Sequence, residues 1–237
     1  MTVCQGFVLK CVNYSDTQRI VHLYTQERGM LSMISPASVF KRKSQPVHLL
    51  QIVEVEYEEN DRGGLHKLKS ASVIANLSDV YFDIYKMNIL LLWGEILYLM
   101  LRNEGRNGKL FEFVARSVEY LNTSREDVAN FNLFFLYRLA SPMGFRIDAE
   151  SWREGHVFHA GDGCFHAPES GTPCISGPNT AKIIHRLCTC EVEDLKGIPL
   201  NREARNILLD VILTFYSIHL NIDFRVKSIQ VIREIFA

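Results

Sequence analysis

A large net charge is the first thing that this sequence lacks. Its 26 Lys and Arg residues are balanced by 27 Asp and Glu residues, so the net charge is −1 when His is neutral. A protein that coats nucleic acid with its whole surface is strongly basic, and this composition excludes that class. Positive charge is nevertheless concentrated locally, because residues 1–50 carry six Lys or Arg against two acids, whereas residues 51–80 carry three against six.

Motifs that assemble a catalytic site are also missing. The sequence contains no GxGxxG after a β-rich run, no Walker A motif, no HExxH and no GxSxG. Asp223 and Glu234 stand alone, and no spacing pairs a nucleophile with a base. We therefore expect a protein that binds rather than an enzyme, with no catalytic residue and no cofactor.

Signals for secretion or membrane insertion are not recognisable either. Residues 1–5 show neither the charged nor the apolar region of a signal peptide. The most apolar run, residues 87–101, is too short to span a bilayer and is interrupted by Gly94 and Glu95, which predicts a buried core helix. The six cysteines are expected to be reduced, which indicates a cytoplasmic protein without a membrane partner.

The residues that are present indicate an ordinary globular core. Hydrophobic residues make up 47% of the 237 positions and charged residues 22%, which suits one small domain followed by a medium one. The first third is rich in β-forming residues separated by turn signals. Five such runs cover residues 6–12, 19–25, 30–35, 47–58 and 65–75. This succession of short strands predicts a closed barrel of the OB type.

From about residue 78 the periodicity becomes helical. Ser78 and Asp79 can cap a first helix, which runs in one or two pieces to about residue 102. Further helices are predicted at residues 109–121, 125–140, 178–188, 202–219 and 225–235. Residues 145–177 are irregular, and we expect a short hairpin there. The predicted fold is α+β, with a five-stranded OB-fold barrel at residues 1–77 and an all-helical C-terminal domain at residues 78–237.

The sharpest feature of the sequence is a basic loop, residues 40–46, between the third and fourth β-runs. Lys41, Arg42 and Lys43 follow Phe40 directly. Three consecutive cations neutralise phosphates with little sequence preference, and an aromatic ring beside them can stack on a base. The alternative is a loop whose charges only keep the protein soluble.

Other surface features of the predicted barrel are less specific. Tyr14 and Tyr24 are further candidates for stacking on bases. In residues 53–58 acids alternate with apolar side chains, so one face of this strand is acidic and should repel phosphate. That face is either a solvated surface or a site for a protein partner, and DNA would bind elsewhere on the barrel.

The irregular segment and the helix after it contain several residues of types that bind metals. They are Cys164, Cys174, Cys188 and Cys190, with His156, His159, His166 and His185. A structural zinc site usually has two closely spaced pairs such as CxxC, and these spacings do not match. Small core thiols and surface histidines explain these residues better, and a metal-dependent enzyme is the weakest hypothesis.

Several stretches occur in an order that is specific when they are taken together. In the N-terminal part they are GFVLK (residues 6–10), YS (14–15), IVHLYT (20–25) and ERGMLS (27–32), followed by a basic loop that ends at Ser44. In the helical part they are FFLYRL (134–139), MGFR (143–146), RVKS (225–228) and VIRE (231–234). This pattern resembles RecO, the family of bacterial recombination mediators.

The resemblance implies an N-terminal OB-fold, a helical C-terminal domain and no turnover of a substrate. It implies binding of single- and double-stranded DNA, annealing of complementary strands, and contact with the C-terminal tail of single-strand DNA-binding protein. It also implies RecR as a partner and an indirect role in loading RecA at gaps, in the cytoplasm and on the nucleoid. Lys10, Arg19 and the loop of Lys41, Arg42 and Lys43 match the family's basic barrel positions.

Two stretches depart from the family pattern. Some members hold zinc with two Cys pairs, the first shortly after the Gly-Phe-Arg turn, but residues 147–154 contain no cysteine. We therefore predict no structural zinc, and we expect the zinc-finger-like insert, residues 145–177, to be held by packing around Trp152 and Phe158. The family's GARR-like loop is replaced by PASVF at residues 36–40.

Two hypotheses of function remain open at this point. In the first, the chain is a DNA-annealing mediator whose helical domain binds the acidic, apolar tail of its partner in a groove edged by cations. The arginines available for such a groove are Arg102, Arg106, Arg116, Arg125, Arg138, Arg202 and Arg205. In the second, the chain is an adaptor that binds only proteins, and its nearly neutral charge favours this hypothesis.

Overall fold

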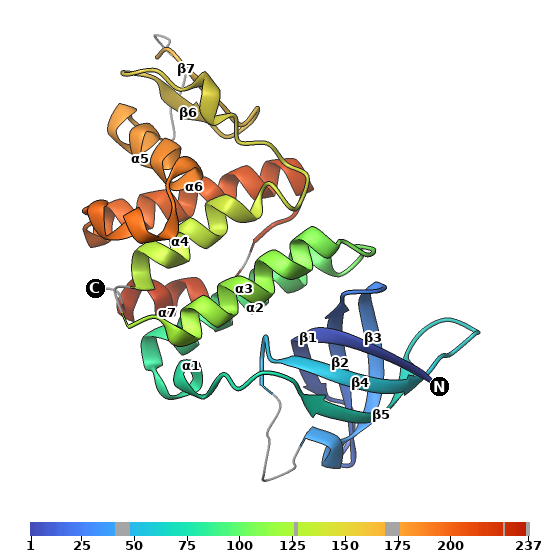
Figure 1. Ribbon diagram of the computed structural model, residues 1–237. Coiled ribbons are helices and arrows are strands. Elements are labelled where there is room, and N and C mark those ends of the chain that lie inside the picture. Colours follow the sequence, from blue (N-terminus) through green and yellow to red (C-terminus); the bar gives the residue numbers. More distant parts are fainter. Residues whose placement is uncertain (41–47, 126–127, 169–175, 225, 236–237) are drawn as a thin grey trace. The chain divides into compact units, whose positions relative to one another are not determined.

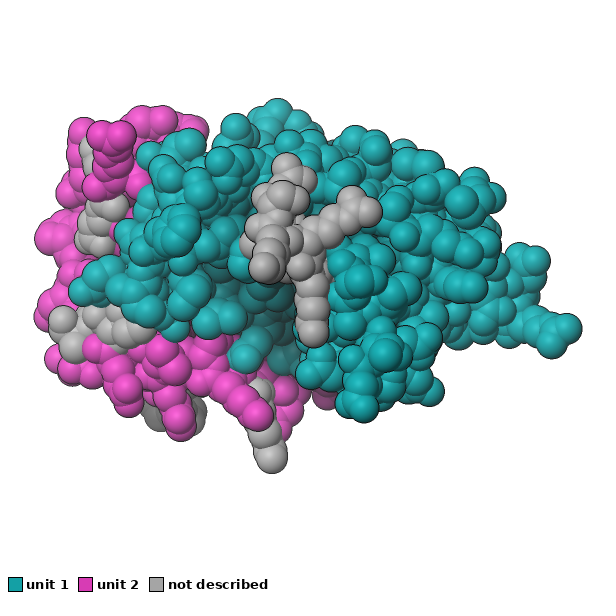
Figure 2. All heavy atoms as spheres, turned by 90° about the horizontal axis from the view of Figure 1, so that it is seen from below, with its two compact units in different colours: residues 1–123 teal, residues 124–237 magenta. Residues whose placement is uncertain are grey.

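The molecule consists of two compact units, Met1–Thr123 and Ser124–Ala237, which Figure 2 shows in different colours. The structure, a computed structural model, describes residues 1–40, 48–125, 128–168, 176–224 and 226–235. The first unit combines a β-barrel with three helices, and the second combines helices with a small hairpin (Figure 1).

Within the described residues, five strands close into a barrel in the first unit. They are β1 (Thr2–Asn13), β2 (Gln18–Thr25), β3 (Gly29–Pro36), β4 (Ile52–Glu58) and β5 (His66–Val73). The strand order is β1-β2-β3-β5-β4, and β4 pairs with β1 to close the barrel. Only the β3–β5 pair is parallel. This is the Greek-key arrangement of an OB-fold, as the sequence predicts.

Apolar side chains alternate with polar ones along the barrel strands because successive residues point to opposite faces. In β4, Val53, Val55 and Tyr57 are fully buried, whereas Glu54 and Glu58 are exposed. Residues from the other strands that complete this core include Cys4, Val8, Val21, Leu23, Met33 and Leu68. The predicted acidic outer face of this strand is therefore confirmed.

Two strands begin four or more residues away from the start of the predicted runs. β1 begins at Thr2 rather than at residue 6, because its first half pairs with β4. β4 begins at Ile52 rather than at residue 47, because Leu50 just before it adopts a φ of 55°. A residue in the left-handed region cannot continue an extended strand.

Three helices follow the barrel in the same unit: α1 (Ser78–Phe82), α2 (Ile84–Leu101) and α3 (Gly108–Thr123). Asp83 has an extended backbone, which ends α1. Its carboxylate then caps α2 by accepting hydrogen bonds from the backbone N–H groups of Tyr85 and Lys86. The predicted helical run to about residue 102 is thus confirmed as two pieces. The predicted cap by Ser78 and Asp79 is wrong, because Leu77 is the cap residue of α1 and its side chain makes no capping hydrogen bond.

α2 contains the apolar run for which a core helix is predicted. By length and composition alone it could cross a membrane, but 61% of it is buried inside the protein. Trp93, Ile96 and Leu97 are fully buried. This burial is that of a core helix, as predicted.

The connection between α2 and α3 packs against the barrel. Tyr24 of β2 donates a hydrogen bond from its hydroxyl to the carbonyl oxygen of Gly105 (2.9 Å), and the backbone N–H of Met30 donates to Glu104 (3.1 Å). The ring of Phe7 in β1 stacks on Phe111 of α3 at 5.3 Å. These contacts explain why the three helices form one compact unit with the barrel.

The second unit is built from four helices and a hairpin within its described residues. They are α4 (Val128–Leu139), α5 (Pro178–Thr189), α6 (Arg202–Leu220) and α7 (Ser228–Ile235), with β6 (Val157–His159) and β7 (Cys164–His166). α4 and α6 are joined by two buried hydrogen bonds, from the Tyr137 hydroxyl to Leu208 and from the Tyr216 hydroxyl to Leu136. The sequence did not predict the 3₁₀ helix η3 (Val192–Gly197) between α5 and α6.

Aromatic packing holds the irregular insert in place. Trp152 stacks on His185 of α5, with ring centres 4.6 Å apart. Phe158 of β6 is buried against Phe165 of β7 and Phe215 of α6. The predicted hairpin and the predicted packing around Trp152 and Phe158 are both confirmed.

Candidate nucleic-acid interface

A hollow of about 410 Å³ opens at one end of the barrel. It is lined by Asn13, Tyr14, Ser15, Asp16, Arg19 and Ala37. The β1–β2 connection forms most of it, and the 3₁₀ helix η1 (Ala37–Phe40) begins beside it, because the Ala37 N–H donates to the Thr17 carbonyl at 2.8 Å. OB-folds bind oligonucleotides with their β2–β3 face and with the β1–β2 and β4–β5 loops. We call this hollow the barrel mouth.

Arg19 lies at the barrel mouth, where the sequence places a basic site residue. It lies on the same face of β2 as the core residue Val21, because residues two apart in a strand share a face. Its Nε atom is buried and has no hydrogen-bond partner among the described residues. A buried donor without a partner is costly, so an oxygen acceptor that enters the mouth would be stabilised.

The two tyrosines that are candidates for stacking on bases differ in exposure. Tyr14 lines the barrel mouth and is 62% exposed, so its ring is accessible to a base. Tyr24 is fully buried between Phe7 and the α2–α3 connection, and burial raises the pKa of its hydroxyl to about 12. The prediction that Tyr24 could stack on a base is therefore wrong, because helices that follow the barrel cover it.

Lys10 lies on the other face of the β1–β2 ribbon. Lys10 pairs with His22 of β2, so the two side chains share a face. His22 is three positions from Arg19, and residues an odd number apart in a strand point to opposite faces. The Nζ atom of Lys10 lies 4.5 Å from the ring centre of Tyr98 in α2, a cation–π contact. Burial and the charge of Lys10 lower the pKa of His22, which keeps this imidazole neutral at neutral pH. The structure does not join Lys10 and Arg19 into one site.

The basic loop lies beyond the part of the chain that the structure describes. The backbone of Phe40 ends η1, but its side chain and the residues Lys41, Arg42 and Lys43 are outside the described residues. In sequence, the three cations follow Ala37 of the barrel mouth by four to six positions.

The acidic strand β4 is separated from the barrel mouth. β4 lies between β1 and β5 and has no pairing with β2. Ion pairs compensate part of its charge: Glu58 with Lys69 at 2.6 Å, and Glu59 just after the strand with Arg28 at 2.7 Å. The hydrogen bond from Lys69 lowers the pKa of Glu58. The acidic strand and Arg19 therefore lie at different places on the barrel.

A second candidate site lies in the second unit, at the start of α6. A cavity of about 20 Å³ there is lined by the buried side chains of Leu133, Leu209 and Ile232 and by polar residues that include Arg202 and Arg205. An open hollow of about 450 Å³ adjoins it and shares Arg202 and Asn206. It is also lined by Asp210, which is paired with Arg233, and by Glu203. We call this surface the α6 hollow.

The comparisons with known protein families cover almost the whole chain. The family model described as recombination protein O N terminal matches residues 1–77, and the model described as recombination protein O C terminal matches residues 81–228. This chain belongs to the RecO family. The first match ends just before α1 and the second begins within it, whereas the compact units divide after Thr123, because α1–α3 pack with the barrel.

Relatives of this RecO chain agree along its full length. The DNA repair protein RecO of Phocaeicola vulgatus is 30% identical over 236 residues, which cover 98% of both chains. The DNA repair protein RecO of Bacteroides fragilis is 29% identical over 237 residues, which cover 98% of this chain and 97% of that protein. The DNA repair protein RecO of Porphyromonas gingivalis is 30% identical over 229 residues, which cover 92% of both chains. The chain is accordingly a DNA repair protein of the RecO family.

The zinc site of some RecO proteins does not fit the residues here. That site needs two Cys pairs, and residues 147–154 have no cysteine, while Cys174 lies outside the described residues. Cys188 on α5 is partly buried, and burial raises its pKa to about 12. A set of four cysteine ligands is therefore not available to this RecO chain among its described residues.

Proposed function

We propose that the chain is a non-catalytic recombination mediator that acts in the cytoplasm, on the nucleoid. It binds single- and double-stranded DNA, anneals complementary strands and helps to load recombinase onto gaps coated by single-strand DNA-binding protein. RecR is its proposed partner in this step, and RecA is engaged indirectly. The observation that carries the proposal is the barrel mouth of an OB-fold in a chain of the RecO family, with Arg19 and Tyr14 in its lining.

The proposed DNA site combines the barrel mouth with the basic loop that follows it in sequence. Arg19 offers a buried donor for a phosphate or base oxygen, and Tyr14 offers an exposed ring for stacking. Phe40, Lys41, Arg42 and Lys43 are proposed to complete the site by adding a ring and three cations. Asp16 also lines the mouth and accepts hydrogen bonds, which suits the amino group of an unpaired base better than a phosphate. This arrangement favours single strands held mainly by their backbone.

The direct test is the salt dependence of single-strand binding, measured by fluorescence anisotropy. Removal of three phosphate contacts in Lys41→Ala/Arg42→Ala/Lys43→Ala should make the slope of log K against log salt shallower by about 2, because each contact to a single strand contributes about 0.7. Affinity at low salt should fall by on the order of 100-fold for the same reason.

A charge-matched variant separates a local site from a general effect of net charge. Arg28→Ala/Lys67→Ala/Lys69→Ala also removes three cations from the barrel, but these lie beside the acids Glu58 and Glu59. It should keep nearly the wild-type slope. Equal losses in both variants would contradict the proposed site, and absence of binding by the wild type at low salt would favour the adaptor hypothesis.

The tail of single-strand DNA-binding protein is proposed to bind in the α6 hollow. Ile207 lines the open hollow and is 37% exposed, which suits an apolar tail residue, and Arg202 and Arg205 suit carboxylates. The Nε atom of Arg205 is buried without a hydrogen-bond partner among the described residues. The N-terminus of α6 adds partial positive charge at the same place. Of the seven arginines that the sequence leaves open, these two are therefore the proposed contacts.

Binding of a fluorescent peptide that corresponds to this tail tests the assignment. Arg202→Glu should weaken binding at least about tenfold, because a charge-assisted hydrogen bond contributes about 1.5–3 kcal/mol and the new carboxylate repels the peptide. Lys182→Glu, an equal change of charge at an exposed position on α5, should leave the affinity within about twofold of wild type. The reverse order of effects would place the tail elsewhere.

A further inference from the structure

The hairpin of β6 and β7 places four side chains of metal-binding types on one surface. In β7, Cys164 and His166 are two residues apart and share a face, while Phe165 between them is buried. His159 of β6 is directly opposite Cys164 in the strand register, so it lies on that same outer face. Asp162 lies in the turn between the strands.

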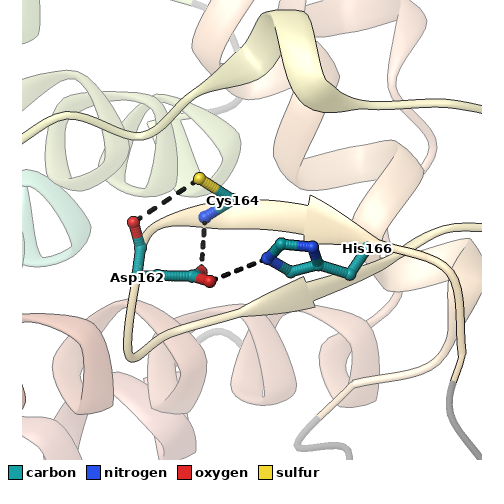
Figure 3. Close-up of side chains that lie close together, drawn as sticks. All are labelled: Asp162, Cys164 and His166. Carbon is teal, nitrogen blue, oxygen red and sulfur yellow. Dashed lines mark hydrogen bonds and ion pairs between the residues drawn. The ribbon is translucent and has the colours of Figure 1, made fainter.

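The distances within this group are those of a compact donor set (Figure 3). The Nε2 atom of His166 lies 2.7 Å from a carboxylate oxygen of Asp162. One ligand atom from each of Asp162, Cys164 and His166 lies within 4.8 Å of the other two. The ring centre of His159 lies 4.8 Å from that of His166. Ligand bonds of about 2.0–2.3 Å place tetrahedral donors roughly 3.3–3.8 Å apart, so small side-chain rotations suffice.

We propose that Asp162, Cys164 and His166 bind one divalent cation of the zinc class, with His159 as the fourth ligand. One sulfur, two imidazole nitrogens and one carboxylate oxygen are the donor types that zinc accepts in a tetrahedral site. On binding, the Cys164 thiol releases its proton to solvent, and the hydrogen bond between His166 and Asp162 is replaced by bonds from both to the metal. The ligand spacing is HxxDxCxH, which differs from two Cys pairs in residue types and in position.

A metal bound at this site would stabilise the outer face of the β6–β7 hairpin. β6 and β7 have three residues each, and a two-stranded hairpin of this size is only marginally stable by itself. Phe158 and Phe165 pack on the inner face, where Phe158 contacts Phe215 of α6. The four proposed ligands lie on the outer face, where a bound metal would join the two strands. The proposal revises the sequence-based expectation of no zinc, which judged the cysteines and histidines of this segment by their spacing.

The test uses the full chain after removal of metal with a chelator. Titration with zinc, in competition with a chromogenic chelator, should show one equivalent bound. Titration with cobalt(II) should give a thiolate-to-cobalt charge-transfer band that Cys164→Ser abolishes. Cys164→Ser and His166→Ala should each lower zinc affinity at least about 100-fold, since loss of an outer partner alone costs about 10–100-fold.

Matched variants keep the test decisive. Cys11→Ser removes an exposed thiol from the barrel and should leave zinc affinity unchanged. Asp162→Asn keeps an acceptor for the Cys164 N–H but removes the negative charge, so it should fold normally by circular dichroism and bind zinc more weakly. Absence of stoichiometric binding by the wild type, or an equal loss in Cys11→Ser and Cys164→Ser, would overturn the proposal.

Discussion

Gly29→Ala is expected to destabilise the first unit by about 3 kcal/mol. Gly29 begins β3 with a φ of 75°, a conformation that costs an alanine about 1–2 kcal/mol. An added Cβ would also meet the backbone of the α2–α3 connection, in contact with the carbonyl group of Gly105 and 2.7 Å from the carbonyl oxygen of Glu104. Backbone atoms cannot rotate away as a side chain can, so overpacking adds about 1–3 kcal/mol.

The matched control for this prediction is Gly63→Ala. Gly63 has a similar φ of 80°, but no atom lies within 4 Å of the Cβ that alanine would add. The control should therefore cost only the conformational strain, about 1 kcal/mol. Urea unfolding followed by circular dichroism measures both free energies. Equal values for the two variants would show that the α2–α3 connection does not pack on the β2–β3 turn.

Trp93→Ala should cost about 3–5 kcal/mol, the range for loss of a large side chain from a packed core. Trp93 is fully buried in the middle of α2. The substitution leaves a cavity that the surrounding helices and strands can fill only in part. Unfolding in urea, followed by circular dichroism because the fluorescence of Trp93 is lost, should show a lower midpoint.

Leu91 in the same helix provides the comparison for Trp93. Its side chain is 41% exposed, so Leu91→Ala should cost about 1 kcal/mol or less. The contrast between two positions of one apolar helix tests whether α2 is a core helix with one solvent-facing side. A wild-type midpoint for Trp93→Ala would contradict its placement in the core.

The candidate site was predictable only in part. Arg19 and Tyr14 follow from the β-rich pattern and the basic character of the first fifty residues, and the structure places both at the barrel mouth. Tyr24 has the same local pattern as a surface aromatic of a strand, yet it is buried by a segment 81 residues later. Lys10 falls on the other face because strand pairing fixes the parity of positions between β1 and β2.

The metal-binding side chains on the hairpin were likewise predictable only in part from the sequence. The sequence contains Asp162, Cys164 and His166 within five residues, but this spacing does not match the closely spaced cysteine pairs of a usual structural zinc site. The antiparallel register adds His159 opposite Cys164, and the buried Phe165 turns the donors outward. Neither fact can be read from spacing alone.

The sequence by itself determined the elements of this protein and its family. Apolar and polar residues that alternate with period two produce the barrel strands, and caps such as Asp83 divide the helices. The ordered motifs identify the RecO family. Each of these signals depends only on neighbours along the chain. The tertiary structure decided which side chains are accessible. It covered Tyr24, separated Lys10 from Arg19, and brought Arg202 and Arg205 to an apolar cavity formed by three helices. Burial depends on which distant segments pack together, and that information lies in the whole fold rather than in any local pattern.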